Sequence, residues 1–341
     1  MKFNGIFAKI ANYVTLPRDP ELEIIGRLDQ YWSQISKWMS SIKNIFTEKF
    51  FVLLSRRLPY QIFMRLPHFE NLFPSINLSG RRRNFFSRLN RKMLGFSIEK
   101  HSHSHTWICK SRLEALFYLR NKQLIQELEN CAQKLTDAIH QAKPAGRPII
   151  LAPMHMHSDL LATLVCARAV NGPVAVVTAH DDISAPTEDI EKLRKVGIEI
   201  ERINPLERDS TRLLTTIRRL RKGEITLISF PDAPPEITHR VFGFSMRTLD
   251  TKLFEGAARI HSGIIELSRL SGAHTIFVCL RWTRHGFDIE ILNVLAPNEL
   301  VENLSLTIER SIRRYPDSWL FWHSPSLFSF NSSDRHFDEN I

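Results

Sequence analysis

The sequence predicts an α/β protein with a mostly parallel central sheet flanked by helices, behind an N-terminal helical region. From residue 147 onward, short runs rich in Val, Ile and Leu alternate with longer amphipathic runs. Strands that alternate with helices form βαβ units, in which the strands are parallel. Residues 20–66 and 104–142 contain few helix breakers, which favours helices before the sheet begins. At 341 residues the chain can bury a full core.

Each expected element follows from the length and the periodicity of its run. Runs of β-branched and other apolar residues predict strands at 147–153, 173–179, 198–203, 225–232, 274–282 and 288–295. Amphipathic runs predict helices at 159–170, 187–197 and 210–223, in the later part of 254–272, and at 300–316. Residues 71–80 predict a loop, because they are rich in Pro, Gly, Ser and Asn.

The net charge of +10 is concentrated in the N-terminal part of the chain, which suggests a polyanionic partner. Residues 45–69 are basic and amphipathic, and such a segment can lie in a membrane interface. The same pattern also fits an ordinary packed helix whose polar face is solvated. We divide the chain into an N-terminal amphipathic helical region (1–76) that we expect to contact a membrane surface, an α/β domain (77–330) and a polar C-terminal tail (331–341).

The sequence contains no apolar run long enough for a transmembrane helix. Its first residues show no long apolar stretch and no small-residue cleavage site, so we expect no secretory signal. Its four cysteines are scattered, without a CxxC pair or the spacing of a disulfide framework, which fits a reducing compartment. We therefore expect a cytoplasmic protein that is peripheral to the inner face of the cell membrane.

The stretch LAPMHMHSDLLATL places three chemistry-bearing side chains between a strand and a helix: His155, His157 and Asp159. Ligands of open α/β sheets bind beyond the carboxyl ends of the strands, and Asp232, in SFPDAPP (229–235), stands at the corresponding end of a later strand. A histidine oriented by a carboxylate can deprotonate an alcohol or an amine. If the turn is helical, His155 and Asp159 share one face and can touch. We therefore expect His155 and Asp159 to be catalytic.

Two other interpretations of this stretch remain open. Ser158 or Asp159 can cap the helix that follows, with the histidines as loop residues. The HxH pair can bind zinc, but no HExxH motif and no cysteine partner accompanies it, so we expect no metal site. The sequence also lacks a P-loop, a GxGxxG motif and a complete nucleophile elbow, and it therefore predicts no nucleotide cofactor.

Motifs between residues 78 and 325 follow one another in a characteristic order. An arginine-rich segment with an asparagine, RRRNFFSRLNRKMLGF, precedes the histidine-bearing turn, and LRKGEITLISFPD follows it. Then come Phe242-Gly243, SRLSGAHTIFV and a closing group of Pro316, Trp319, Trp322 and His323. This succession resembles the lysophospholipid acyltransferase superfamily, particularly its branch of bacterial lipid A biosynthesis (lauroyl/myristoyl) acyltransferases.

The resemblance implies a glycerol-phosphate acyltransferase-like fold and acyl transfer from acyl-CoA or acyl carrier protein to a hydroxyl or amine of a lipid or metabolite. The donor is then a substrate, and no cofactor is bound. His155 takes the proton of the attacking group and Asp159 orients it, without a covalent intermediate. Basic groups neutralise substrate phosphates, and an apolar groove holds the acyl chain, whose burial is worth about 0.8 kcal/mol per CH₂. The residues that we expect to bind substrate are His157, Asp232, Phe242, Arg247, Arg218 and Arg219.

Two competing functions stay open. One residue fewer separates His155 from Asp159 than in the motif of the family, which fits a catalytically degenerate protein of the same fold that binds lipid or a partner protein. The basic N-terminal third fits a nucleic-acid binder whose affinity falls steeply with salt. No reader motif accompanies those basic residues, so we expect no nucleic-acid partner.

Overall fold

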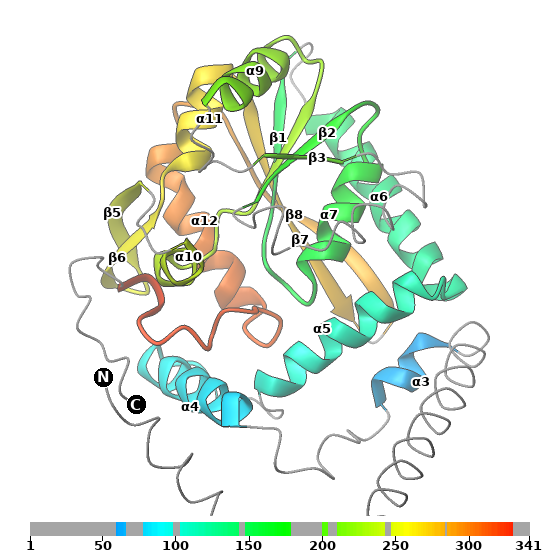
Figure 1. The fold of residues 1–341 in the computed structure, drawn as a ribbon, viewed down its shortest axis with the longest axis vertical. Helices are drawn as coiled ribbons and strands as arrows, with labels where there is room; N and C mark the ends of the chain where they lie inside the picture. The colour runs from blue at the N-terminus through cyan, green and yellow to red at the C-terminus, as the bar shows by residue number, and fades with distance from the viewer. Residues whose placement is uncertain are drawn as a thin grey trace, which may run out of the picture. The chain divides into compact units, whose positions relative to one another are not determined.

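Figure 1 shows the computed structural model of the protein. It describes residues 59–65, 78–97, 103–142, 147–178, 200–203, 210–242, 247–283 and 285–329. The chain divides into two compact units, Met1–Leu54 and Ser55–Ile341, and every described residue belongs to the second. Of the predicted N-terminal helical region, only α3 (Tyr60–Arg65) and the residue before it fall within the described part. The rest of that region, the predicted helix at 187–197 and the tail 331–341 lie outside it.

The second unit is built on a six-stranded sheet with the order β3-β2-β4-β1-β7-β8. Five of these strands run parallel, and β8 pairs antiparallel with β7. The mostly parallel sheet predicted from the sequence is therefore confirmed. Its strands are β1 (Ile149–Pro153), β2 (Val174–Val177), β3 (Ile200–Ile203), β4 (Thr226–Ser229), β7 (His274–Thr283) and β8 (Gly286–Leu295).

β1 lies inside the sheet and positions the candidate site. All five of its residues are buried, and a strand that is buried on both faces has the continuous apolar sequence seen in IILAP. Leu151 pairs with Ile228 of β4 on one side and with Ile276 of β7 on the other. The carboxyl ends of β1 and β4 are therefore neighbours, although β2 and β3 come between them in the sequence.

Helices cover both faces of the sheet (Figure 1). One face carries α6 (Lys122–Ala142) and α7 (Asp159–Arg168), and the other carries α9 (Ser210–Arg221), α11 (Gly263–Ser271) and α12 (Leu300–Arg314). At the edge where the parallel strands end, α4 (Leu78–Met93) packs against α5 (His103–Tyr118). Among the helices of the described part, none combines the length and the apolar character needed to cross a lipid bilayer.

Three elements are absent from the prediction. β5 (Thr248–Leu253) and β6 (Gly256–His261) form a separate antiparallel hairpin, and α10 (Pro235–Phe242) follows β4. The sequence of β5, TLDTKL, contains only two apolar residues, Leu249 and Leu253, so its strand signal is weak. The predicted loop at 71–80 is wrong for its last residues, because α4 begins at Leu78.

The segment after α12 returns across the carboxyl edge of the sheet and ends in a short 3-10 helix, η3 (Leu327–Ser329). Met156, in the loop after β1, forms an isolated antiparallel bridge with Trp319. The amide of Leu320 donates to the carbonyl of His155 at 3.0 Å. The C-terminal segment is thus attached to the loop that carries the predicted site.

α4 holds the same segment from its outer side. Asn90 Nδ2 donates to the carbonyl oxygens of Trp322 and Ser324, at 2.9 and 2.7 Å. Arg91 is 1% exposed, lies 2.6 Å from Asp317 and stacks over the Trp322 ring at 5.2 Å. In Figure 1, α4 accordingly lies beside the red and orange C-terminal segment.

Candidate active site

His155 lies two residues beyond the end of β1, and Asp232 lies three residues beyond the end of β4. Because β1 and β4 are adjacent and parallel, both residues emerge at the same edge of the sheet. His155 Nδ1 lies 2.7 Å from Asp232 Oδ1, and the backbone N–H of His155 donates to Asp232 Oδ2 at 3.0 Å. The carboxylate of Asp232 therefore holds His155 at two points.

The Asp232 carboxylate is fully buried and hydrogen-bonded. Trp319 Nε1 donates to its Oδ2 at 2.9 Å, beside the backbone amide of His155, and the imidazole Nδ1 of His155 lies next to its Oδ1. Hydrogen-bond donors are what an ionised carboxylate needs when it is removed from water. Because such a carboxylate can only accept, it places the imidazole proton on Nδ1 of His155 and leaves the Nε2 lone pair available to a substrate proton.

Two aromatic rings fix the imidazole of His155. The ring centroids of Phe230 and Phe321 lie 4.4 and 4.5 Å from that of His155. The side chain of His155 is 13% exposed, and no residue of the described part hydrogen-bonds its Nε2. Packing and the Asp232 hydrogen bond together hold the ring in one orientation.

The structure pairs Asp159 with a lysine, where the sequence predicts a contact with His155. Asp159 Oδ1 lies 2.8 Å from Lys110 Nζ. Helix α7 begins only at Asp159, and Ser158 is its N-cap, whose Oγ accepts from the Leu161 amide at 3.1 Å. The turn before Asp159 is therefore not helical, and the i,i+4 argument does not apply. Burial opposes ionisation of Asp159, but the charges of Lys110 and His155 outweigh it and lower the pKa.

Lys110 ties the loop after β1 to α5. Its Nζ also lies 2.6 Å from Glu114 Oε1, and Ser158 Oγ donates to the same oxygen at 2.7 Å. Burial opposes the charge of Lys110, but Asp159 and Glu114 outweigh it and raise the pKa. Burial also raises the pKa of Glu114, against the lowering effect of Lys110. One cation shared by two acids thus fixes the start of α7.

His157 takes no part in the His155 pair. Its φ of 53° lies in the left-handed region, and its ring meets Trp282 edge-on at 6.3 Å. Its Nε2 is buried and has no hydrogen-bond partner within the described ranges. Burial lowers the pKa of His157 to about 4, so the ring is neutral at neutral pH.

The two arginines of α9 lie at the opposite edge of the sheet from the pair. Arg218 and Arg219 belong to the last turn of α9, which leads into the amino end of β4, whereas Asp232 follows its carboxyl end. Arg219 Nη1 donates to Glu201 Oε2 at 2.7 Å, and Arg218 is exposed. The fold therefore does not bring these predicted substrate contacts to His155.

The remaining predicted contacts belong to the region around the β5–β6 hairpin. Arg247 has an 84% exposed side chain and lies 3.5 Å from Glu266. Phe242 is the last residue of α10, and its side chain lies outside the described part.

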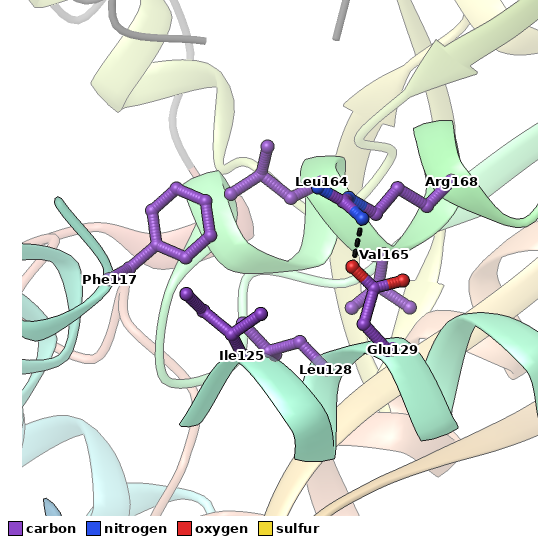
Figure 2. Close-up of a pocket in the computed structure, with 7 residues that line it drawn as sticks. All are labelled: Phe117, Ile125, Leu128, Glu129, Leu164, Val165 and Arg168. Carbon is purple, nitrogen blue, oxygen red and sulfur yellow. Dashed lines mark hydrogen bonds and ion pairs between the residues drawn. The ribbon is translucent and has the colours of Figure 1, made fainter. Parts of the chain in front are cut away.

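A small apolar hollow lies between α5, α6 and α7 (Figure 2). The ion pair of Glu129 and Arg168 lies at one side of it. The hollow touches the carboxyl-terminal half of α7, whereas His155 precedes the amino end of that helix, so it is separate from the pair. Its apolar walls are formed by Phe117, Ile125, Leu128, Leu164 and Val165.

Several residues of the site have roles that the sequence does not predict. Asp232 is expected as a substrate contact but is the partner of His155. Trp319 is noted only as part of a family motif, and Phe230 and Phe321 are not singled out. The run SWLFWH contains a usable signal, because a buried Trp usually finds a hydrogen-bond partner for its N–H.

A neutral imidazole backed by a buried carboxylate can act as a general base on a hydroxyl, amine or thiol. Within the described ranges, no group of three His, Cys, Asp or Glu side chains could hold a metal ion. No protein-family model matches the chain, and no curated protein sequence matches it either.

Proposed function

We propose that this protein is an acyltransferase that moves a fatty acyl group from acyl-CoA or acyl carrier protein to a hydroxyl or amine of a lipid or metabolite. One observation carries the proposal: the 2.7 Å contact between His155 Nδ1 and the buried carboxylate of Asp232, at the carboxyl edge of a parallel sheet. The order of the sequence motifs, which resembles that of lysophospholipid acyltransferases, supports the reaction type.

His155 is the general base of the proposed reaction. Its Nε2 takes the proton of the acceptor as the acceptor oxygen or nitrogen attacks the thioester carbonyl carbon. The C–S bond then breaks, and the imidazolium gives the proton to the leaving thiolate, so no acyl-enzyme forms. Asp232 holds Nδ1–H throughout and stabilises the imidazolium between the two proton transfers.

The proposal assigns a positioning role to Asp159. Its pair with Lys110 holds the loop that carries His155 against α5. Arg247, with its exposed side chain, is a candidate for contact with a substrate phosphate. Residues 1–76 are the proposed attachment to the inner face of the membrane.

The second candidate is a catalytically degenerate protein that binds lipid or a protein partner through the same fold. The burial of the imidazole between Phe230 and Phe321 favours this candidate, because a histidine can fasten a sheet edge without performing catalysis. It predicts binding of acyl-CoA without turnover.

The test compares lipids and small metabolites, by mass spectrometry, from cells that express the wild-type protein or His155→Ala. An acylated product is expected in cells that express the wild type and absent in cells that express His155→Ala. Thermal unfolding of both proteins serves as the control that the variant is folded. A product that persists with His155→Ala overturns the assignment of the base. Acyl-CoA binding without any product supports the second candidate.

Two matched substitutions decide which carboxylate serves His155. Asp232→Asn is expected to lower turnover on the order of 10²-fold or more, because the amide no longer stabilises the imidazolium. Asp159→Asn is expected to lower it less than about tenfold, through the loosened loop. The reverse order of the two effects contradicts the assignment of Asp232.

A further inference from the structure

α4 carries a row of exposed apolar side chains. Phe85, Leu89 and Met93 are 62, 39 and 74% exposed. They are spaced four residues apart, so the 3.6-residue period of the helix places them on one side. Exposed apolar side chains that adjoin one another mark an interaction surface, whereas single ones are ordinary.

Three exposed cations border this row: Arg82, Arg88 and Lys92. At 3.6 residues per turn, the six side chains together occupy an arc of about 140° of the helix. The sequence of α4 contains no acidic residue. The six residues, which we call the α4 face, thus combine apolar groups with uncompensated positive charge on one surface.

The opposite side of α4 is fixed to the protein. Ser87, Asn90 and Arg91 are buried. Asn90 binds two carbonyl groups of the C-terminal segment, and Arg91 pairs with Asp317. The α4 face therefore cannot turn inward unless these buried contacts break. The same C-terminal segment carries Trp319, which binds the Asp232 carboxylate.

We infer that the α4 face docks on an anionic lipid bilayer. Apolar side chains flanked by cations are the composition of a helix that lies in the headgroup region, where apolar burial and attraction to anionic lipid add. This surface is distinct from residues 1–76, and the inference does not depend on the proposed acyl transfer.

Other occupants fit the α4 face less well. A second copy of the chain would bring Arg82, Arg88 and Lys92 against the same three cations, which opposes association. A nucleic acid would use the cations but would leave Phe85 and Met93 in water.

The test places an environment-sensitive fluorophore on the α4 face of the full-length protein. All four native cysteines are buried, so Phe85→Cys can be labelled selectively with nitrobenzoxadiazole. Val301→Cys on α12, where the native side chain is 50% exposed, is the matched control. Vesicles of phosphatidylcholine with phosphatidylglycerol are expected to raise the emission at position 85 at least about threefold, with a blue shift, and to leave position 301 unchanged.

A charge-matched pair tests the cations. Replacing Arg82, Arg88 and Lys92 by Glu is expected to weaken vesicle binding at low salt at least about tenfold. Replacing the exposed Arg120, Lys122 and Lys252 by Glu changes the net charge equally and is expected to weaken it less than about threefold. Equal losses in the two triple variants overturn the inference.

Four results with the labelled proteins also overturn it. The first two are an emission at position 85 that anionic vesicles leave unchanged, and an emission that changes equally at positions 85 and 301. The third is an emission at position 85 that is already blue-shifted relative to position 301 before vesicles are added. The fourth is a larger change of emission at position 85 with DNA than with vesicles. None of these measurements requires turnover, so a failure of the proposed acyl transfer is distinguishable from a failure of docking.

Discussion

The indole N–H of Trp319 donates to the Asp232 carboxylate at 2.9 Å and so connects the C-terminal segment to the partner of His155. Trp319 is fully buried, and its ring is stacked on Phe328 and meets Trp322 edge-on. The site is therefore completed only when the last described segment has packed across the sheet edge.

Trp319→Phe tests this connection. Phe keeps an aromatic ring but removes one of the N–H donors that hold the Asp232 carboxylate, so the carboxylate no longer fixes the imidazole of His155 in one orientation. We expect turnover to fall about tenfold, because the base is less well oriented. We also expect the free energy of unfolding to fall by about 2–4 kcal/mol.

Trp322→Phe is the matched control for Trp319→Phe. Trp322 is equally buried, but its Nε1 donates to the carbonyl of Pro316 at 2.6 Å and not to Asp232. It should lose similar stability in urea unfolding and keep its turnover within about threefold of the wild type. A tenfold loss of turnover in both variants, or in neither, contradicts the role given to Trp319.

Asn90→Ala tests how α4 holds the C-terminal segment. The substitution removes two hydrogen bonds to the carbonyls of Trp322 and Ser324, and we expect it to cost about 2–3 kcal/mol in urea unfolding. Amide hydrogen exchange across 317–324 should become faster. Asn303→Ala, whose side chain bonds only its own helix, should stay within about 0.5 kcal/mol. Unchanged exchange across 317–324 would show that α4 does not secure the segment.

His157→Asn tests the buried neutral imidazole. The folded-state pKa of His157 is lowered from 6.5 to about 4, so as the pH falls the unfolded chain takes the proton first. The wild type should therefore lose stability between pH 6.5 and 4 relative to the variant, by up to about 3 kcal/mol. Asn tolerates the left-handed backbone at this position.

The measurement for His157→Asn is urea unfolding of both proteins from pH 7 to pH 4. The difference between the two free energies of unfolding should be constant above pH 6.5, the ordinary pKa of histidine, and should change below it. Parallel curves over the whole range would mean that the ring is not buried in its neutral form.

Gly286→Ala and Gly172→Ala separate backbone strain from steric conflict. Both glycines have a left-handed φ, 115° and 119°, which costs a non-glycine residue about 1–2 kcal/mol. A Cβ on Gly286 would meet the carboxylate of Glu127, which Tyr60 and the amide of Phe287 hold in place, whereas a Cβ on Gly172 has open space. The free energy of unfolding of Gly286→Ala should therefore be lower than that of Gly172→Ala by about 1–3 kcal/mol, in thermal or urea unfolding. Equal losses would show that Glu127 moves away freely.

Much of the fold follows from local sequence patterns. The run IILAP has the length and composition of a buried strand, and the runs at 225–232 and 274–282 have the same character. These runs also place His155 and Asp232 after strand ends, where parallel sheets bind ligands. The β5–β6 hairpin has no comparable signal, because the sequences of its strands, TLDTKL and GAARIH, contain no continuous run of large apolar residues.

Local patterns are enough to predict the α/β class, the strands of the main sheet and the location of His155 at a strand end, because strand and helix periods are local properties of the chain. That Asp232, and not the nearby Asp159, meets the imidazole, and that Trp319 supports it, follows only from the folded chain. β1 and β4 become neighbours when they pair in the sheet, although β2 and β3 come between them in the sequence. Such a long-range pairing brings together residues whose spacing along the chain carries no sign of it.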